Sequence, residues 1–270
     1  MNDVRVVAGV LSDDTGRVLI AQRPVGKALA GRWEFPGGKI NADESELAAL
    51  SRELAEEIGI RVLAAEPLMV VRHHYPQAAR AVEVAAWRVT AWRGVPQSLD
   101  DQALQWCLPA ALLDVDVLEA DQPIITALRL PRQFVRASVD QCVAHYASRS
   151  GGAPLAWVFD HSPDDVLRNV IEAARHLYFE VGADPELRLC RGGNTRLTGC
   201  CVSTLRDCHA AIAMGADFLL LHDPIMAADD WRALSRVGVP WYAHPLQIPA
   251  AVVPVGTLSW DGEIRTGPSL

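Results

Sequence analysis

The stretch from Gly38 to Ile60, GKINADESELAALSRELAEEIGI, gathers acidic residues at helical spacing. Glu53, Glu56 and Glu57 stand at i, i+3 and i+4, which are neighbouring positions on one face of an α-helix. A helix here therefore presents three carboxylates side by side, and their like charges repel one another.

The rest of the stretch predicts where this helix begins, ends and packs. Asp43 is the expected N-cap, Glu44 and Glu46 fall in the first turn, where the helix dipole favours anions, and Gly59 is the expected stop. The opposite face carries apolar residues at spacings of three and four that can dock on a sheet: Leu47, Leu50, Leu54 and Ile58.

The three glutamates allow two interpretations. An acidic helix face is usually solvated, and Arg52 could pair with Glu56 at i+4. Alternatively, a hard divalent cation relieves the repulsion, because such ions prefer carboxylate oxygens and, for Mg²⁺, substrate phosphates.

The stretch also fits Gly-x5-Glu-x7-Arg-Glu-Leu-x-Glu-Glu-x-Gly-Ile without a gap. It thus resembles an unbroken Nudix box. Roughly residues 4 to 130 resemble the MutT-type Nudix hydrolases, which act on oxidised guanine nucleotides. Further matches are WEFPGGK before the box, Arg23, Tyr75-Pro76, Gly94 with Pro96, Trp106, and Asp-Gln-Pro at 121–123.

The fold expected for residues 1–131 is the α+β Nudix fold, a mixed sheet with helices packed on it. Strands are expected at 4–10 and 17–21 around a DDTG turn and at 104–107, and apolar segments lie near 67–72 and 81–92. A further helix is expected near 122–129.

Residues 132–270 are predicted to form a second, α/β domain. Apolar runs such as AWVFD at 156–160 alternate with helical patterns such as PDDVLRNVIEAARHL, which indicates βαβ units. The segment GCCVSTLRDCHAAIAMGADFLLLHDPI resembles thiamine-phosphate synthase or TenI-type barrels. A full (β/α)8 barrel needs about 200 to 250 residues, so a truncated TIM-barrel-like domain is expected. His222 and Asp223 end a strand there, and without phosphate partners a structural role is the more common one.

The Nudix resemblance implies a metal-assisted attack of water on a diphosphate. It assigns Glu53, Glu56, Glu57 and the Gly38 carbonyl as ligands of Mg²⁺, with Mn²⁺ as an alternative. Glu53 and Glu57 are also expected to be catalytic. The catalytic set is completed by Arg52, which orients a ligand glutamate, by Glu44, which supports the loop or a second metal, and by Asp100, a ligand or water-activating base.

The same resemblance suggests four contacts to the nucleotide: Arg23, Phe35, Arg80 and Asp121. Asp121 departs from the MutT pattern, which usually has Asn there. An ionised aspartate keeps a hydrogen-bond acceptor but faces O6 of the base with a negative charge. A broader or shifted substrate preference follows, unless Asp121 is protonated.

Composition excludes several other functions. A formal charge of −8 and a pI near 5.5 argue against a nucleic-acid or membrane surface, which needs clustered Lys and Arg. The six cysteines lack CxxC spacing, so reduced thiols and a cytoplasmic location are expected. Alternatives remain: hydrolysis of another nucleotide or a thiamine-related pyrophosphate, with the second half as a binding or dimerisation module that could support a homodimer.

Overall fold

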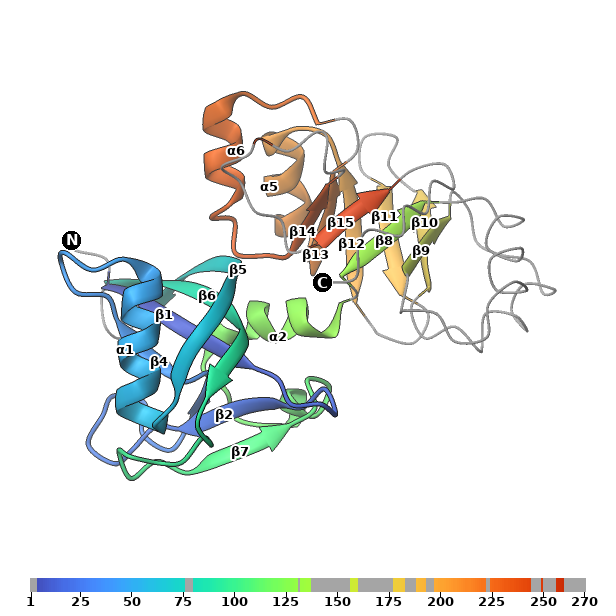
Figure 1. The fold of residues 1–270 in the computed structure, drawn as a ribbon. Coiled ribbons are helices and arrows are strands. Elements are labelled where there is room, and N and C mark those ends of the chain that lie inside the picture. The colour runs from blue at the N-terminus through green and yellow to red at the C-terminus, as the bar shows by residue number, and fades with distance from the viewer. Residues whose placement is uncertain are drawn as a thin grey trace. The chain divides into compact units, whose positions relative to one another are not determined.

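The computed structural model describes residues 4–75, 80–130, 132–136, 156–159, 177–182, 188–192, 197–221, 224–243, 249 and 256–259. The chain divides into two compact units. The first comprises Met1–Arg129 with Arg236–Gly238, and the second comprises Leu130–Ser235 and Val239–Leu270. Figure 1 labels most elements of both, and each unit is described by itself below.

The first unit contains a mixed four-stranded sheet, as expected from the sequence. Its order is β4-β1-β6-β5, with β1 (Val4–Leu11) parallel to β6 (Arg80–Arg93) and antiparallel to β4 (Gly37–Lys39). β5 (Arg61–Tyr75) runs antiparallel to β6. A smaller antiparallel sheet has the order β3-β2-β7, from β3 (Trp33–Glu34), β2 (Val18–Gln22) and β7 (Leu104–Cys107).

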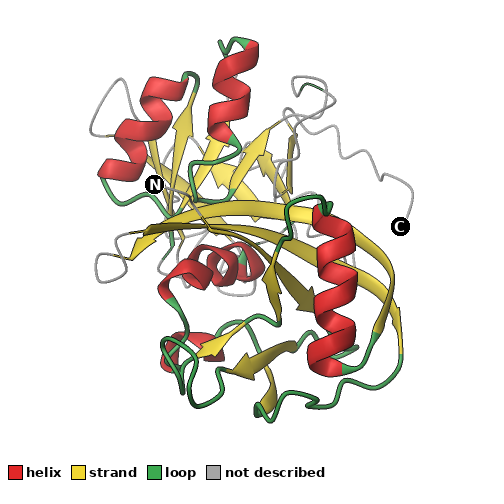
Figure 2. Cartoon of the chain, turned by 90° about the vertical axis from the view of Figure 1, so that its left-hand side faces the viewer, coloured by secondary structure: helices red, strands yellow, loops and turns green. Residues whose placement is uncertain are grey.

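The two longest strands, β5 and β6, are irregularly paired. Their register shifts between Val62 and Ala64, at Ala65, and again between Pro67 and Met69. Bulges of this kind bend a strand and increase its twist, and Figure 2 shows long curved strands beside the helix α1.

Helix α1 (Glu46–Ile58) packs its apolar face on the larger sheet. Leu50, Leu54 and Ile58 are fully buried among residues of β1, β2 and β6. Gly9 on β1 permits this close approach, since a Cβ there would lie 2.9 Å from a methyl group of Leu54. The expectation that Leu47 packs on the sheet is wrong, because this first-turn leucine is 44% exposed. The first residue of α1 in the buried core cluster is Ala49.

The end of the first unit is a series of short helical turns. η2 (Ala111–Asp114) and η3 (Glu119–Asp121) precede α2 (Gln122–Arg129), which has the expected bounds and buries Ile124, Ile125 and Ala127. Arg32 fixes this segment, donating to Asp116 at 2.9 Å, to Glu119 at 2.7 Å and to the Val117 carbonyl at 2.7 Å. The segment therefore has a defined place beside β3.

In the second unit, hydrogen-bonded strands follow one another in an order that closes on itself. The order is β10-β11-β12-β13-β14-β15-β8-β9, and β9 pairs with β10. β11 runs antiparallel to both neighbours, whereas a (β/α)8 barrel is all-parallel. The truncated TIM-barrel-like architecture therefore stays a prediction. The strands are β8 (Gln133–Arg136), β9 (Ala156–Phe159), β10 (Leu177–Gly182), β11 (Arg188–Gly192), β12 (Thr198–Val202), β13 (Phe218–Leu221), β14 (Trp241–Ala243) and β15 (Gly256–Ser259).

Strand-helix alternation is confirmed in part of this unit. Helix α5 (Leu205–Ala213) joins β12 to β13, and α6 (Ala228–Leu234) joins β13 to β14, with the three strands parallel. Thr204 caps α5 by accepting from the N–H of Asp207 at 3.2 Å. The helix expected after Pro163, together with His222 and Asp223, lies outside the described residues.

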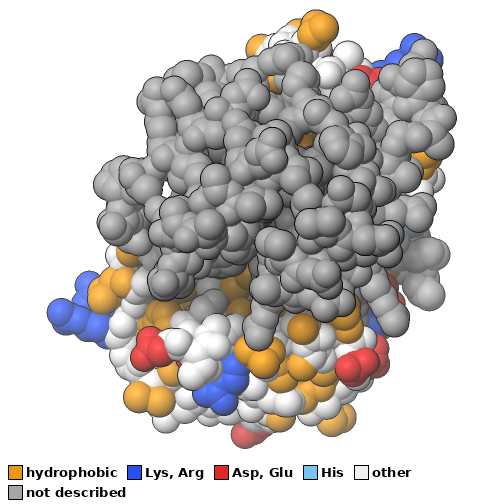
Figure 3. Space-filling model, turned by 90° about the vertical axis from the view of Figure 1, so that its right-hand side faces the viewer, with side chains coloured by type: hydrophobic (Ala, Val, Ile, Leu, Met, Phe, Trp, Pro, Cys, Tyr) orange, Lys and Arg blue, Asp and Glu red, His pale blue; other side chains and the backbone are white. Residues whose placement is uncertain are grey.

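The sequence predicts reduced thiols and a surface without clustered basic residues. Cys107, Cys200, Cys201 and Cys208 are free thiols. Within the described ranges, no helix is long and apolar enough to cross a bilayer. On the face drawn in Figure 3, the coloured basic and acidic side chains are scattered among apolar and neutral ones.

Candidate active site

The helix α1 begins and ends with specific hydrogen bonds. Its N-cap is Ser45, whose Oγ accepts from the N–H of Ala48 at 3.2 Å, so the expectation of Asp43 is wrong by two residues. The extended backbone at Ser45 aims its side chain at the free amides of the first turn. Glu44 consequently precedes the helix. Gly59 ends it in a left-handed conformation with φ of 69°, as expected.

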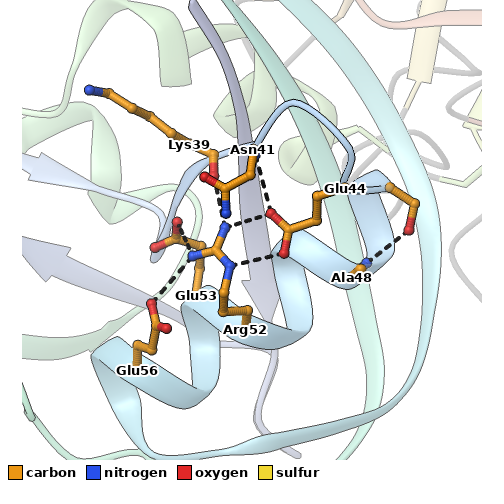
Figure 4. A network of polar contacts seen from close by, with 8 residues as sticks. Lys39, Asn41, Glu44, Ala48, Arg52, Glu53 and Glu56 are labelled. Carbon is orange, nitrogen blue, oxygen red and sulfur yellow. Dashed lines mark hydrogen bonds and ion pairs between the residues drawn. The ribbon is translucent and has the colours of Figure 1, made fainter.

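Arg52 is the centre of the polar network in Figure 4. Its guanidinium donates to both oxygens of Glu44, at 2.9 and 2.7 Å, and to Glu53 at 2.7 Å. It also reaches Glu56 at 3.3 Å and the Lys39 carbonyl at 3.0 Å. Arg52 thus makes both the i+4 pair with Glu56 and the contact that can orient Glu53.

Glu44 supports the loop that leads into the helix. One of its carboxylate oxygens accepts from the backbone N–H of Asn41 at 3.2 Å, and both accept from Arg52. These contacts, with Arg52 first, lower the pKa of Glu44. The carboxylate therefore stays ionised and occupied as a structural partner of Arg52.

Two glycines bring the backbone against the helix carboxylates. The N–H of Gly37 donates to Glu57 at 3.0 Å. A Cβ on Gly38 would lie 2.3 Å from an oxygen of Glu53, so a larger residue there would displace that carboxylate. The carboxylates of Glu53 and Glu57 thus lie against one short piece of backbone, with the Gly38 carbonyl in the same piece.

Glu57 is largely buried, and too little positive charge lies near its carboxylate to balance the loss of solvation. Desolvation raises its pKa to about 7, opposed by the hydrogen bond from Gly37 and raised further by the nearby charge of Glu34. A cation at this position would restore the ionised form. Hard oxygen donors and an under-compensated carboxylate therefore fit a divalent metal.

The three glutamates do not all point to one place. Glu53 is 15% exposed, whereas Glu56 is 61% exposed and turns toward Arg52. Among the described residues, no three acidic, histidine or cysteine side chains converge as a preformed metal site. The ligand set expected from the sequence would need another orientation of the Glu56 side chain, which its exposure leaves room for.

A second group of charges lies around Glu34, which the sequence analysis did not single out. Glu34 pairs with Arg23, and burial raises its pKa. Its charge acts on both Glu57 and Asp121. A charged residue inside the apolar run WEFPGG was the available signal.

Two expected nucleotide contacts have defined positions. Arg23, besides its pair with Glu34, donates from Nε to the Ala28 carbonyl at 2.8 Å, so it is held by its own loop. Phe35 is buried, with 3% exposure. The side chain of Arg80 lies outside what the structure describes.

Asp121 is a buried carboxyl that is hydrogen-bonded to the backbone of the WEFPGG segment. It is 4% exposed, and one oxygen accepts from the N–H of Phe35 at 3.0 Å. Desolvation raises its pKa to about 7. Near neutral pH the free oxygen can therefore present either a proton or a lone pair.

Asp100 is not free in this structure. It is half exposed and accepts from Lys27 at 2.8 Å. Lys27 was also not singled out from the sequence, and the charges of Glu57 and Glu34 contribute to raising its pKa after the larger effect of Asp100. The expected ligand or base is therefore paired with a cation beside the buried glutamates.

Comparison with known proteins places this geometry in context. Residues 2–128 match the model of the NUDIX domain. The chain is 40% identical over 127 residues to a CTP pyrophosphohydrolase of Escherichia coli (strain K12), a match covering 47% of this chain and 92% of that protein. It is 41% identical over 129 residues to a putative 8-oxo-dGTP diphosphatase 2 of Mycobacterium tuberculosis (strain H37Rv), covering 47% and 89%. The solution structure of the E. coli ORF135 protein matches with 39% identity and a TM-score of 0.43, covering 48% of this chain and 92% of that one.

Proposed function

Because this chain belongs to the Nudix family of hydrolases, we propose that it is a divalent-cation-dependent pyrophosphohydrolase of nucleoside triphosphates. The products are the monophosphate and pyrophosphate, and the substrate class is an oxidised nucleotide such as 8-oxo-dGTP. The observation that carries the proposal is the pair of carboxylates, Glu53 and Glu57, held against the Gly37–Gly38 backbone.

Mg²⁺ or Mn²⁺ would be held by Glu53, Glu56, Glu57 and the Gly38 carbonyl. When bound, such a cation neutralises charge on phosphate oxygens and helps generate the attacking hydroxide. Arg52 orients Glu53 through a charge-assisted hydrogen bond of 2.7 Å. Glu44 in turn fixes Arg52, so these two residues act by positioning.

The nucleotide is proposed to lie against the second group of charges. Arg23 supplies a fixed positive charge for the nucleotide, and Asp121 supplies the base contact through the oxygen that Phe35 does not use. Protonated Asp121 donates to an acceptor such as O6, and ionised Asp121 accepts from a donor. Its pKa of about 7 makes both forms available, which supports a preference broader than that of an Asn-containing site.

The base itself is the finer part of the proposal. The two relatives are named for different bases, cytosine and 8-oxoguanine. A panel of CTP, dCTP, dGTP, 8-oxo-dGTP and thiamine diphosphate, assayed with Mg²⁺ for kcat/KM and for the released products, distinguishes them. Release of orthophosphate instead of pyrophosphate from triphosphates, or full activity in EDTA, would contradict the proposal.

We further propose that residues 1–131 carry all of the hydrolase activity. Every residue of the candidate site lies there, and the second unit is proposed to be a shortened thiamine-phosphate synthase-like module for binding or dimerisation. The truncated chain should match the full chain in kcat/KM for the best nucleotide, although newly exposed apolar surface can lower its solubility. A folded but inactive fragment, or synthesis of thiamine phosphate by the full chain, would show this division to be wrong.

A further inference from the structure

Lys27 joins two loops beside the candidate active site. It lies in the loop between β2 and β3, next to Gly26 with φ of 97° and Val25 with 99% exposure. The base of that loop is closed by backbone hydrogen bonds between Arg23 and Arg32 at 2.9 Å and between Gly31 and Arg23 at 2.9 Å. The Nζ atom of Lys27 reaches Asp100 at 2.8 Å, 73 residues away in sequence.

The loop that carries Asp100 is hydrogen-bonded to the end of helix α1. The N–H of Gln97 donates to the Ile58 carbonyl at 3.1 Å, and the N–H of Leu99 donates to the Glu57 carbonyl at 3.0 Å. The loop that carries Asp100 therefore caps the C-terminal end of α1. Of the two loops, the one that carries Lys27 is held less closely to the helix by the described contacts.

The charges around Lys27 are those of the active site. Glu57 and Glu34 both act on the Lys27 ammonium, and Lys27 acts on both of them. The other cations of the site are already held, Arg23 by Glu34 and Arg52 by Glu44 and Glu53. Among the described contacts, the Lys27 side chain is held only by an ion pair with Asp100 that is open to solvent. The side chain of Lys27 is 46% exposed and that of Asp100 is 50% exposed.

An exposed ion pair of this kind contributes little to the stability of the fold. A triphosphate carries several negative charges, and a hydrogen bond from an ammonium to phosphate is among the stronger ones. Exchange of the Asp100 carboxylate for a phosphate oxygen is therefore favourable for Lys27. The flexible four-carbon stem of lysine allows it without a backbone change.

We propose that Lys27 is a substrate-binding residue that leaves Asp100 to contact the polyphosphate of a bound nucleoside triphosphate. This inference rests on the proposed triphosphatase function and adds to it a contact from the β2–β3 loop. The exchange also releases the Asp100 carboxylate beside the site. Lys27 contributes to binding both the ground state and the transition state, so its loss raises KM more than it lowers kcat.

The chain offers a direct test, because Lys27 and Lys39 are its two lysines. The full chain with Mg²⁺ is treated with an amine-reactive reagent, and labelling is followed by mass spectrometry with the α-amine as internal reference. A methylene-bridged, nonhydrolysable triphosphate analogue at saturating concentration should slow labelling of Lys27 at least about fivefold, and the matching monophosphate should not. Unchanged labelling of Lys27 under saturation by the analogue would overturn the inference.

Kinetics supply the second arm. Lys27→Gln should raise KM for the triphosphate roughly tenfold, as expected for loss of one charged hydrogen bond, with kcat changed less than about twofold, and Lys27→Arg should restore much of the loss. Arg17→Gln is the matched control, because Arg17 is also a half-exposed loop cation paired with an aspartate, Asp13, at 2.7 Å.

Equal KM values for Lys27→Gln, Arg17→Gln and the unmodified chain would refute the Lys27 contact while leaving the hydrolase proposal intact. A chain that neither binds nor hydrolyses any triphosphate would refute both. Thermal melting of each variant verifies that the comparison is made between folded proteins.

Discussion

The backbone N–H of Phe35 donates to a carboxylate oxygen of Asp121 at 3.0 Å, across 86 residues of sequence. Phe35 lies just before the glycines that contact Glu53 and Glu57, and Asp121 is the last residue of η3, immediately before α2. A carboxyl buried to 4% exposure thereby accepts a hydrogen bond from a backbone N–H. Its charge is only partly compensated, and its pKa rises to about 7.

Asp121 should make the stability of the fold depend on pH. Below about pH 4 both the folded and the unfolded states carry the proton. Between about pH 4 and 7 only the folded state keeps it, so the free energy of unfolding falls as pH rises, by at most about 4 kcal/mol. Asp121→Asn should remove this dependence, so the stability of the variant relative to the unmodified chain should grow from pH 4 to pH 7.

Chemical denaturation in EDTA across this pH range measures the effect. Asp114→Asn is the control, since Asp114 is exposed on the preceding 3-10 turn. A constant difference between the Asp121 variant and the unmodified chain would mean that Asp121 is already ionised at low pH.

Asp121→Asn should also sharpen the preference for 8-oxo-dGTP over dGTP. The amide always donates from nitrogen to O6, and its oxygen has two lone pairs, enough to accept from both Phe35 and the N7–H of the damaged base. A good bidentate contact contributes about 1 to 3 kcal/mol of discrimination. The ratio of kcat/KM values for the two nucleotides should rise about tenfold or more. A highly selective unmodified chain, with no gain in the variant, would show that Asp121 does not read the base.

Glu57→Gln should separate activity from stability. Gln can still accept from the Gly37 N–H, and it removes a buried carboxyl whose ionisation is unfavourable, so the melting temperature at pH 8 in EDTA should not fall. Turnover with Mg²⁺ should fall more than roughly 100-fold, because even residues that only support a metal ligand account for 10- to 100-fold. Glu66→Gln, on β5 and half exposed, serves as the control. A Glu57 variant with full turnover would contradict the assigned ligand set.

Arg52→Lys should be nearly as harmful as Arg52→Gln. The guanidinium serves Glu44, Glu53, Glu56 and the Lys39 carbonyl at once, and an ammonium cannot reproduce that planar set of donors. Apparent Mg²⁺ affinity should weaken roughly 10- to 100-fold. Titration of Mg²⁺ against activity measures it, with Arg17→Lys as the control. Full rescue by lysine would mean that charge alone suffices at this position.

Local features of the first unit were predictable from sequence. The helix over the box, its glycine stop, the strand at 104–107 and the helix at 122–129 follow from periodicity and turn residues. The N-cap was missed because Asp43 and Ser45 are both good capping residues, and only the backbone angles decide between them. The exposure of Leu47 was not predicted, because periodicity shows only which face of the helix a residue lies on. Whether that residue is buried depends on how far the neighbouring core residues extend along the helix.

The less predictable part of the site depends on contacts distant in sequence. Glu34 becomes important because folding buries it near Asp121 and Glu57, and no local pattern encodes that burial. Lys27 and Asp100 belong to separate loops, and their pairing requires the tertiary fold. In the second unit, the reversed direction of β11 is likewise invisible to hydrophobic patterning, because parallel and antiparallel strands can share the same composition.

The segment from Phe35 to Gly37 has a consequence for how such an enzyme could diversify. One end of this tripeptide holds Asp121, and the other end holds Glu57. Between them, the Pro36 carbonyl is tied to the N–H of Gly9 at 2.8 Å, so the tripeptide is fixed at three points. A substitution that retunes the choice of base by shifting this backbone would also shift Glu57, the carboxylate proposed to bind the metal. Substitutions that give new substrate preferences should therefore occur most readily in side chains outside the tripeptide, where they can change selectivity without lowering the rate of hydrolysis.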